Sequence, residues 1–200
     1  MQQSEKSRIT KEKILASAEA EFSEKGLAAA RVDDIADLAG VNKRMVYAHF
    51  TSKEGLYKEV LKIVYARLYQ YEDKILKIEF TEPSVIREAI VMYFEFLKNN
   101  KSFVRLVLWE NLEYAKYVES TDGVLFKGIE KLLLKGKENG FVKEDIDIKQ
   151  TAMSCNLFCF SAFSNVYTLS HMLGEDLTSE EEMDKRINHV ADVLSEFILK

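Results

Sequence analysis

The segment from Asp33 to Lys53 constrains the fold more than any other part of the chain. Its first ten residues, DDIADLAGVN, indicate a short helix, a tight turn at Gly40 and the start of a second helix at Asn42. Glycine permits such a turn because it has no Cβ, and asparagine is a favoured N-cap residue. The pattern predicts a helix-turn-helix unit.

The second of these helices carries an unusual concentration of basic side chains. Residues 42–53 read NKRMVYAHFTSK, and no acidic residue lies between Leu38 and Lys53, although the formal net charge of the chain is -5. Residues 1–58 contain ten Lys/Arg and nine Asp/Glu, a net charge of +1, so the acidic excess lies in the remainder. A weakly basic helix-turn-helix on an acidic body favours contact with DNA phosphates, with the second helix in the major groove.

Lys43 and Arg44 stand at the start of this second helix, where they can reach base edges or phosphates. Tyr47 and His49 can donate to phosphate oxygens, although both rings could instead be packed against the protein. Lys53 falls in the first turn of the next helix, whose N-terminus attracts anions. The full set of candidates for contact with DNA is Arg31, Asn42, Lys43, Arg44, Tyr47, His49 and Lys53.

The rest of the chain is predicted to be helical too. One proline and eight glycines favour long helices, and β-branched residues show no sustained alternation. Helices are expected at about 7–25, 32–38, 42–50, 52–77, 83–98, 101–117, 122–139, 147–174 and from about 178 onward. The predicted fold is all-α, with a three-helix head in residues 1–52 and a larger helical domain in residues 53–200.

A longer pattern surrounds the helix-turn-helix. It consists of Ile14-Leu15, Ala18, Phe22, Gly26, Val32, Asp34-Ile35-Ala36, Ala39-Gly40-Val41, Lys43, Tyr47, His49-Phe50, Ser52-Lys53-Glu54 and Leu56. This pattern resembles the tetracycline-repressor (TetR) family of bacterial transcription regulators. The family usually has two hydroxyl residues before the second helix, where this chain has Ala30 and Arg31. The missing hydroxyl N-cap costs about 1 kcal/mol, which Arg31 could offset by pairing with a phosphate.

The resemblance implies a ligand-responsive, DNA-binding regulator, most simply a repressor that a small molecule releases from its operator. It also implies a homodimer formed by the last two helices, whose apolar faces are wide enough to need a partner. The candidates for the dimer interface are Phe163, Met183, Ile187, Val190, Leu194 and Phe197. The candidates for the wall of a ligand cavity are Met92, Tyr93, Phe96, Phe103, Val107, Glu110, Tyr114, Phe126 and Phe158.

Glu110 is the notable member of the ligand set. It shares the inward-facing stripe of its helix with Phe103, Val107 and Tyr114. A carboxylate in such a place either accepts from an internal donor, for which Tyr93 and Tyr114 are the candidates, or waits for a polar or cationic ligand. If there is no internal donor, the ligand is expected to be small, mostly apolar and cationic.

Two other functions compete with this one. Cys155 and Cys159 lie one helical turn apart and could form a redox sensor on the same head, although buried cysteines usually behave as small hydrophobes. A helical enzyme is the other alternative, but the sequence has no H-E-x-x-H, G-x-S-x-G or phosphate-loop pattern, and its three histidines lie far apart. No catalytic residue, metal or cofactor is therefore expected.

The N-terminal segment lacks the apolar core of a secretion signal. The least charged stretch, residues 150–174, holds too many polar residues for a bilayer crossing. We expect a cytoplasmic protein with two reduced cysteines and no membrane partner.

Overall fold

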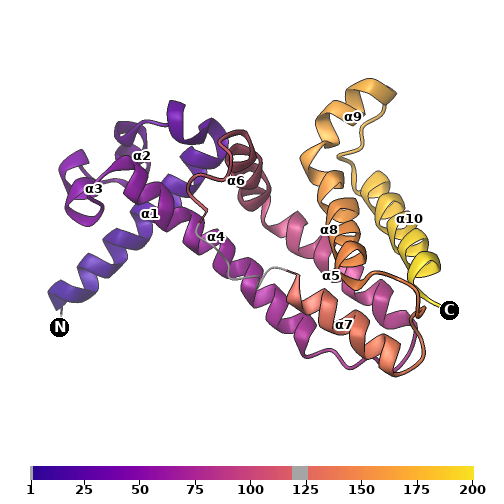
Figure 1. The fold of residues 1–200 in the computed structure, drawn as a ribbon. Coiled ribbons are helices and arrows are strands. Elements are labelled where there is room, and N and C mark those ends of the chain that lie inside the picture. The colour runs from indigo at the N-terminus through magenta and orange to yellow at the C-terminus, as the bar shows by residue number, and fades with distance from the viewer. Residues whose placement is uncertain (1, 119–125) are drawn as a thin grey trace. The chain divides into compact units, whose positions relative to one another are not determined.

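The structure is a computed structural model that describes residues 2–118 and 126–200. Ten α-helices occupy these two ranges (Figure 1). They are α1 Gln2–Ala29, α2 Val32–Ala39, α3 Lys43–His49, α4 Lys53–Leu76, α5 Ser84–Asn99, α6 Lys101–Leu112, α7 Lys127–Glu138, α8 Ile148–Ser164, α9 Val166–Leu173 and α10 Glu180–Ile198. Extended pairing in the described ranges is limited to one antiparallel bridge between Val142 and Leu199. The all-α class is confirmed, with ten helices where the sequence indicated nine.

The chain forms two compact units. The first unit comprises Met1–Ala66 with Ser102–Glu119, and the second unit comprises Arg67–Lys101 with Ser120–Lys200. The first half of α4 thus belongs to the first unit and its second half to the second. The first unit is larger than the predicted head of residues 1–52, because it also takes in this half of α4 and the whole of α6 apart from its first residue.

The helix-turn-helix forms as the sequence predicts. Gly40 adopts a left-handed conformation (φ 67°) at the end of α2, and the amide of Val41 donates to the carbonyl of Ala36 at 3.0 Å. The side chain of Asn42 caps α3 by accepting from the amide of Met45 at 2.9 Å. Arg31 occupies the N-cap of α2 without a side-chain hydrogen bond, which confirms that the hydroxyl cap is missing.

Side-chain bonds join α6 to α1 within the first unit. Ser102 and Arg105 of α6 bond to Glu19 and Glu24 of α1. Farther along, the indole nitrogen of Trp109 donates to the carbonyl of Ser23 at 3.2 Å. The regular part of α1 ends at Gly26, next to the predicted end near residue 25. The consequence is a head whose first helix is held by a segment far away in sequence.

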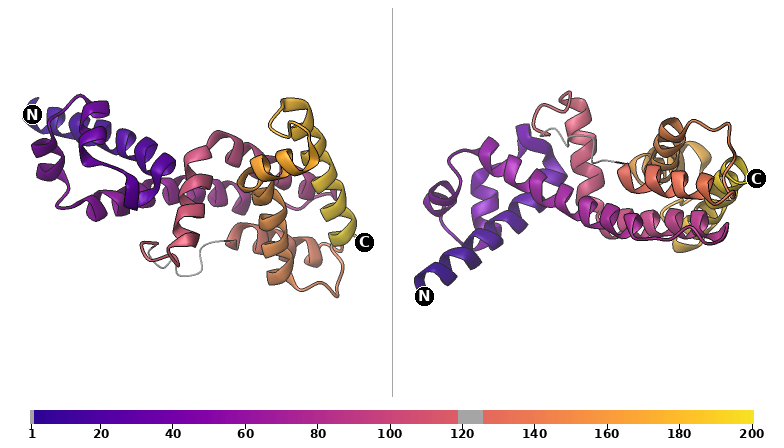
Figure 2. Two further views of the ribbon diagram at one scale, coloured as in Figure 1. Left: turned by 90° about the horizontal axis from the view of Figure 1, so that it is seen from above. Right: turned by 60° about the horizontal axis from the view of Figure 1, so that its bottom comes forward.

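The second unit is a bundle in which α8 packs against α5, α7 and α10 (Figure 2). Side-chain caps begin two of its helices close to the starts that the sequence predicts. Asp147 accepts from the amide of Gln150 at 3.0 Å at the start of α8, and Ser179 accepts from the amide of Glu182 at 3.3 Å at the start of α10. None of the described helices combines the length and the apolarity that a bilayer crossing requires.

Two predicted helices differ from the observed ones in the way they end or break. The helix expected at 147–174 is interrupted at Asn165, whose side chain accepts from the hydroxyl of Ser164, and this break separates α8 from α9. The helix expected at 101–117 ends at Leu112, because Tyr114 and Ala115 take positive φ angles of 57° and 55°. The predicted helix start near Asp122 lies outside the described residues.

Candidate functional site

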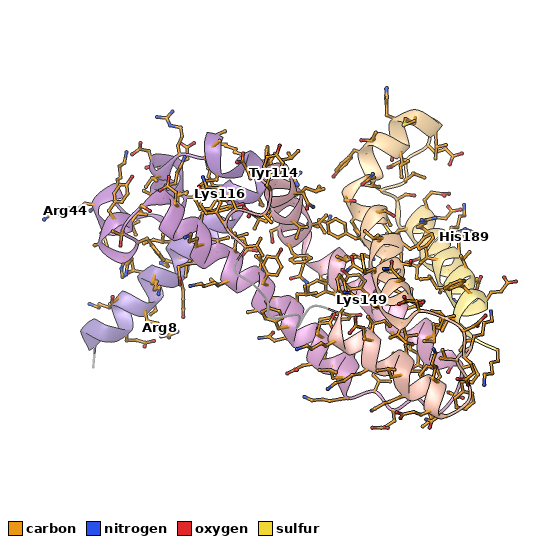
Figure 3. The ribbon with its side chains drawn as sticks, viewed as in Figure 1. Arg8, Arg44, Tyr114, Lys116, Lys149 and His189 are labelled. Carbon is orange, nitrogen blue, oxygen red and sulfur yellow. The ribbon has the colours of Figure 1, made fainter. Side chains whose placement is uncertain are left out.

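Helix α3 presents a basic and aromatic face to solvent. Lys43, Arg44 and Tyr47 are exposed, whereas Val46 is buried against the rest of the head. Figure 3 shows Arg44 projecting away from the helix. Lys43 forms a half-exposed ion pair with Asp33 at 3.0 Å, but none of the described residues forms an ion pair with Arg44. The guanidinium of Arg44 therefore has its donors available for another molecule.

The remaining DNA candidates flank α3. Arg31 is exposed at the start of α2, and His49 is half-buried beside the ring of Phe50. The ammonium of Lys53 donates to the carbonyls of Ala28 and Ala30 at 3.3 and 3.1 Å. Because a lysine has three donors, one N–H of Lys53 remains for a phosphate. Asn42 serves as the helix cap described above, so its side-chain oxygen is already engaged.

Glu110 is buried in the first unit and has internal donors. It is 2% exposed, and it accepts from the hydroxyl of Tyr57 at 2.8 Å and from the amide of Tyr117 at 3.0 Å. Burial and the adjacent carboxylate both raise the pKa of the Tyr57 hydroxyl. The predicted donors were wrong, since Tyr114 is 96% exposed and Tyr93 belongs to the second unit. With these partners the carboxylate needs no cationic ligand.

A pocket does lie beside Glu110. It has a volume of about 380 Å³ and is bounded by the end of α1, the first turn of α4 and the end of α6. Its two lysines are engaged: Lys53 as described above, and Lys25 in ion pairs with Glu21 and Asp34 at 2.8 and 3.0 Å. This pocket is part of the first unit, whereas the sequence indicated a cavity among the helices of the larger domain.

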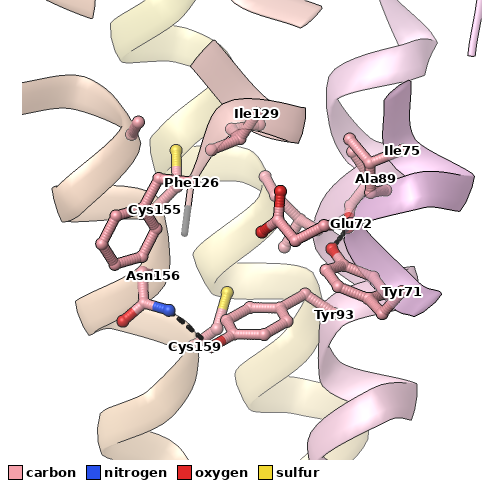
Figure 4. A pocket seen from close by; sticks show the side chains of 12 residues that line it. Tyr71, Glu72, Ile75, Ala89, Tyr93, Phe126, Ile129, Cys155, Asn156 and Cys159 are labelled. Carbon is pink, nitrogen blue, oxygen red and sulfur yellow. Dashed lines mark hydrogen bonds between the residues drawn. The ribbon is translucent and has the colours of Figure 1, made fainter. Parts of the chain in front are cut away.

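The second unit contains a smaller cavity of about 30 Å³ (Figure 4). Its wall is mostly apolar and aromatic, with a few polar groups that point inward. The hydroxyl of Tyr71 donates to the carbonyl of Ala89 at 3.3 Å, and the amide of Asn156 donates to the hydroxyl of Tyr93. The lining residues are Tyr71, Glu72, Ile75, Ala89, Ile90, Tyr93, Phe126, Ile129, Ala152, Cys155, Asn156 and Cys159.

The predicted ligand residues do not form one site. Tyr93 and Phe126 line the cavity, and Phe96 stacks on Tyr71 with ring centroids 5.3 Å apart. Met92 is half-buried on α5, and Phe158 is 41% exposed on α8. The members that belong to the first unit instead are Phe103, Val107, Glu110 and Tyr114. The stripe of α6 therefore packs within the head and does not line this cavity.

Glu72 is the functional candidate that the sequence analysis missed. It is 6% exposed, and its carboxylate accepts from the amide of Gly128 at 2.7 Å. Burial raises the pKa of Glu72, although main-chain amides at the start of α7 oppose the shift. Leu68 and Ile75, which are buried on the same helix, lie four residues before it and three after it. A carboxylate on an apolar stripe was the signal that could have revealed it.

Cys155 and Cys159 also face the cavity. Both are buried, and burial raises the pKa of Cys155 to about 12 and that of Cys159 still further. Thiols in such surroundings stay protonated and react slowly. No group of three or more His, Cys, Asp or Glu side chains among the described residues is placed to hold a metal ion.

Comparison with known families decides between these possibilities. The family described as "Bacterial regulatory proteins, tetR family" matches residues 14–60, and "Tetracyclin repressor-like, C-terminal domain" matches residues 84–194. Together the two matches cover the helix-turn-helix and most of the second unit. The chain belongs to the TetR family.

Relatives of known name support this membership. The repressor NicS of Pseudomonas putida is 27% identical over 191 residues, which cover 92% of this chain and 90% of NicS. The repressor SCO4008 of Streptomyces coelicolor is 32% identical over 108 residues, which cover 52% of this chain and 51% of SCO4008. Among solved structures, the regulator SCO4942 of Streptomyces coelicolor has the same fold, with a TM-score of 0.73 and 22% identity over 94% of this chain and 98% of that one.

TetR-family membership has two consequences. The protein is a transcription regulator that binds operator DNA through its helix-turn-helix, and it is not an enzyme. The individual DNA contacts of α3 and its neighbours stay predictions.

The dimer interface expected of this TetR-family chain needs revision. Val190 and Leu194 are 1% and 2% exposed, so they belong to the core of the protomer and cannot contact a partner. Phe163 packs on the ring of Phe94 at 5.9 Å, and Met183 and Ile187 are half-buried. Of the predicted set, only Phe197 is well exposed. The apolar residues exposed on α8 and α10 are Met153, Leu157, Phe158, Val193 and Phe197.

Proposed function

We propose that this chain is a cytoplasmic, homodimeric repressor that a small-molecule effector releases from its operator. The observation that carries the proposal is the basic face of α3, where Arg44 is exposed within a complete helix-turn-helix. NicS, SCO4008 and KstR2 of Rhodococcus jostii are named as repressors, while FasR of Mycolicibacterium smegmatis is named as an activator. Three of these four relatives are named as repressors, which favours repression.

The proposed contacts divide into two kinds. Arg44, with Lys43 beside it, reads base edges in the major groove, because a guanidinium can pair with guanine in two places. Arg31, Tyr47, His49 and the remaining N–H of Lys53 bind phosphates and fix the register. A helix as short as α3 gains from dimerisation, since two half-sites one helical turn apart double the contact set.

The proposed effector site is the cavity of the second unit, because its wall is mostly apolar and supplies a few inward polar groups. The effector would favour a dimer whose two heads are spaced wrongly for the operator. Thermodynamic linkage then requires that DNA weaken effector binding by the same factor. The redox alternative receives little support, because both cysteines are buried and have raised pKa values.

The first experiment is to select binding sites from random duplex DNA with the wild-type protein and to measure affinity against salt concentration by fluorescence anisotropy. Arg44→Ala should bind the selected site more weakly and discriminate less between sequences. Lys149→Ala is the matched control, because Lys149 is an exposed cation on α8 (Figure 3). Equal losses in the two variants would count against α3 as the reading helix.

A further inference from the structure

The carboxylate of Glu72 lies among the side chains that line the cavity of the second unit (Figure 4). It is buried, and it accepts from the main-chain amide of Gly128 at 2.7 Å. Among the described residues, no lysine, arginine or histidine lines this cavity. A buried carboxylate is costly unless hydrogen bonds or an opposite charge compensate it. Main-chain amides compensate this charge, and among the described residues that line the cavity no cationic side chain does.

Glu72 also holds the start of α7. Phe126 occupies the N-cap position of α7 with a positive φ of 71° and provides no side-chain hydrogen bond. The first amides of a helix have no intrahelical partner, and the Glu72 carboxylate takes this place by accepting from Gly128. A Cβ on Gly128 would lie 2.4 Å from the carboxylate oxygen, so the contact requires a glycine. The carboxylate is thus a cap for α7 that comes from another helix, α4.

The cavity offers aromatic surface next to this carboxylate. The rings of Tyr71 and Tyr93 stack with centroids 5.3 Å apart, and both side chains line the cavity with Phe126. Tyrosine rings attract cations through their faces, and the aliphatic part of the wall suits an apolar body. The Glu72 carboxylate would repel an anionic molecule, and Glu130 of α7 adds to the negative potential.

We propose that the effector is a small organic amine whose ammonium group pairs with Glu72 while its apolar or aromatic body lies against Tyr71 and Tyr93. This inference rests on the proposed function and specifies the chemical class of its ligand. A charge-assisted hydrogen bond between ammonium and carboxylate is stronger than a bond from a neutral donor. The amine thereby supplies the positive charge that the cavity wall lacks.

The size of the cavity indicates what must move. A volume of about 30 Å³ is far smaller than the roughly 150 Å³ that accommodates benzene in a protein interior. The first turn of α7 is the part of the wall that competes with the amine, because the Gly128 amide uses the same carboxylate. Binding of an ammonium group at Glu72 releases this turn, which enlarges the cavity and changes the conformation of the second unit.

The test uses the full-length protein without DNA. Benzylamine, phenethylamine and tryptamine are compared with benzyl alcohol and benzoate, which have similar bodies but no positive charge, by thermal shift and calorimetry at millimolar concentrations. At least one amine should bind and raise the melting temperature, and the alcohol and the carboxylate should not. Binding of the alcohol or the carboxylate as tightly as the best amine, or no binding by any amine, overturns the proposal.

Variants locate the site. Glu72→Gln keeps the shape of the side chain, removes its charge and should weaken amine binding at least tenfold. Glu110→Gln is the matched control, because it removes a buried carboxylate beside the pocket of the first unit and should leave amine binding unchanged. The opposite pattern would assign the amine to the first unit. If Glu72→Gln does not fold, the comparison of amine with alcohol on the wild type still decides the matter.

A separate readout distinguishes this inference from the proposed function. Gly128→Ala forces the Glu72 carboxylate away from α7, so it should weaken operator binding without any amine, as an effector would. An amine that binds at Glu72 but leaves the operator complex intact would refute release by the effector and not the ligand class. Release of the operator by neutral molecules, unaffected by Glu72→Gln, would refute the ligand class and not the function.

Discussion

The ammonium group of Lys53 has a structural role besides its proposed contact with DNA. Two of its donors satisfy carbonyls of Ala28 and Ala30, after the last turn of regular α1 helix. Lys43, ten residues earlier, has only a half-exposed ion pair with Asp33, and pairs of that kind contribute little to stability. The two lysines therefore differ in their structural roles as well as in their proposed contacts with DNA, which are base edges for Lys43 and a phosphate for Lys53.

This difference predicts the behaviour of two alanine variants. Lys53→Ala should lower the free energy of unfolding by about 1–2 kcal/mol, because it removes charged hydrogen bonds to main-chain carbonyls. Lys43→Ala should change it by less than about 0.5 kcal/mol. Lys53→Ala should weaken binding to all duplexes alike and reduce the salt dependence, whereas Lys43→Ala should also lower the preference for the selected site. Urea unfolding and anisotropy titrations measure the two effects, and equal stabilities would show that the bonds of Lys53 contribute nothing.

For single residues, the sequence predicted which carboxylate is buried better than it predicted the hydrogen-bond donors to that carboxylate. Glu110 was correctly identified as a carboxylate on an inward-facing stripe, but its donors, Tyr57 and the amide of Tyr117, could not be deduced. Tyr57 lies 53 residues away on another helix, and periodicity within one helix carries no information about contacts at that separation. Glu72 has the same signature on α4 and was missed.

Among the elements, α1 depends on a glycine that α6 covers. Gly26 has φ 70°, and a Cβ there would lie 2.8 Å from the ring of Trp109. Gly40 has φ 67°, but its Cβ would meet nothing within 4 Å. Both positions require a left-handed backbone, but an added Cβ would meet another side chain only at Gly26.

Alanine variants of these two glycines separate the cost of backbone strain from the cost of overpacking. Gly40→Ala should cost about 1 kcal/mol, the penalty of a left-handed conformation in a residue with a Cβ. Gly26→Ala should cost at least about 2 kcal/mol, because overpacking against the indole adds to that penalty. Differential urea unfolding of the two variants gives the comparison. Equal losses would mean that α6 yields to the extra methyl group without cost.

Most helices were predictable from the sequence, and the errors in their predicted bounds have local causes. Helices with strong caps, such as α8 at Asp147 and α10 at Ser179, start where the sequence indicated. The early end of α6 was not predictable, because the turn after it is held by the Glu110 carboxylate accepting from the Tyr117 amide. The break at Asn165 has only a weak sequence signal, a polar Ser-Asn pair within an apolar run.

For the whole molecule, Glu72 predicts a pH dependence of stability. Its pKa is raised in the folded state above the reference value of 4.5, so the unfolded chain ionises first as the pH rises. The contribution of Glu72 to the free energy of unfolding is therefore complete below about pH 4.5 and declines as the pH rises through the folded-state pKa. Glu72→Gln should gain stability relative to wild type between pH 4 and pH 7. Parallel stability curves across this range would contradict the raised pKa.

Assembly is tested with the exposed residues of α8 and α10. Leu157 and Phe197 are 60% and 54% exposed, and they stand on two helices that pack against each other. The double variant Leu157→Glu, Phe197→Glu should be a folded monomer in sedimentation experiments and should lose operator binding.

Two controls accompany this experiment. Leu134→Glu, at an exposed site on α7, should remain a dimer, and Leu194→Glu should unfold because Leu194 is in the core. A double variant that still dimerises would place the interface elsewhere.

The discontinuous first unit has a consequence for how the protein is made. The helix-turn-helix leaves the ribosome early. The partner of the Tyr57 hydroxyl, Glu110, and the partner of the end of α1, Trp109, are synthesised much later. Contacts between such distant segments form slowly, because a long loop must close first. A nascent chain that has emerged only as far as Ala66 therefore holds the reading helix without its complete support. Ability to recognise an operator should appear only once α6 has left the ribosome.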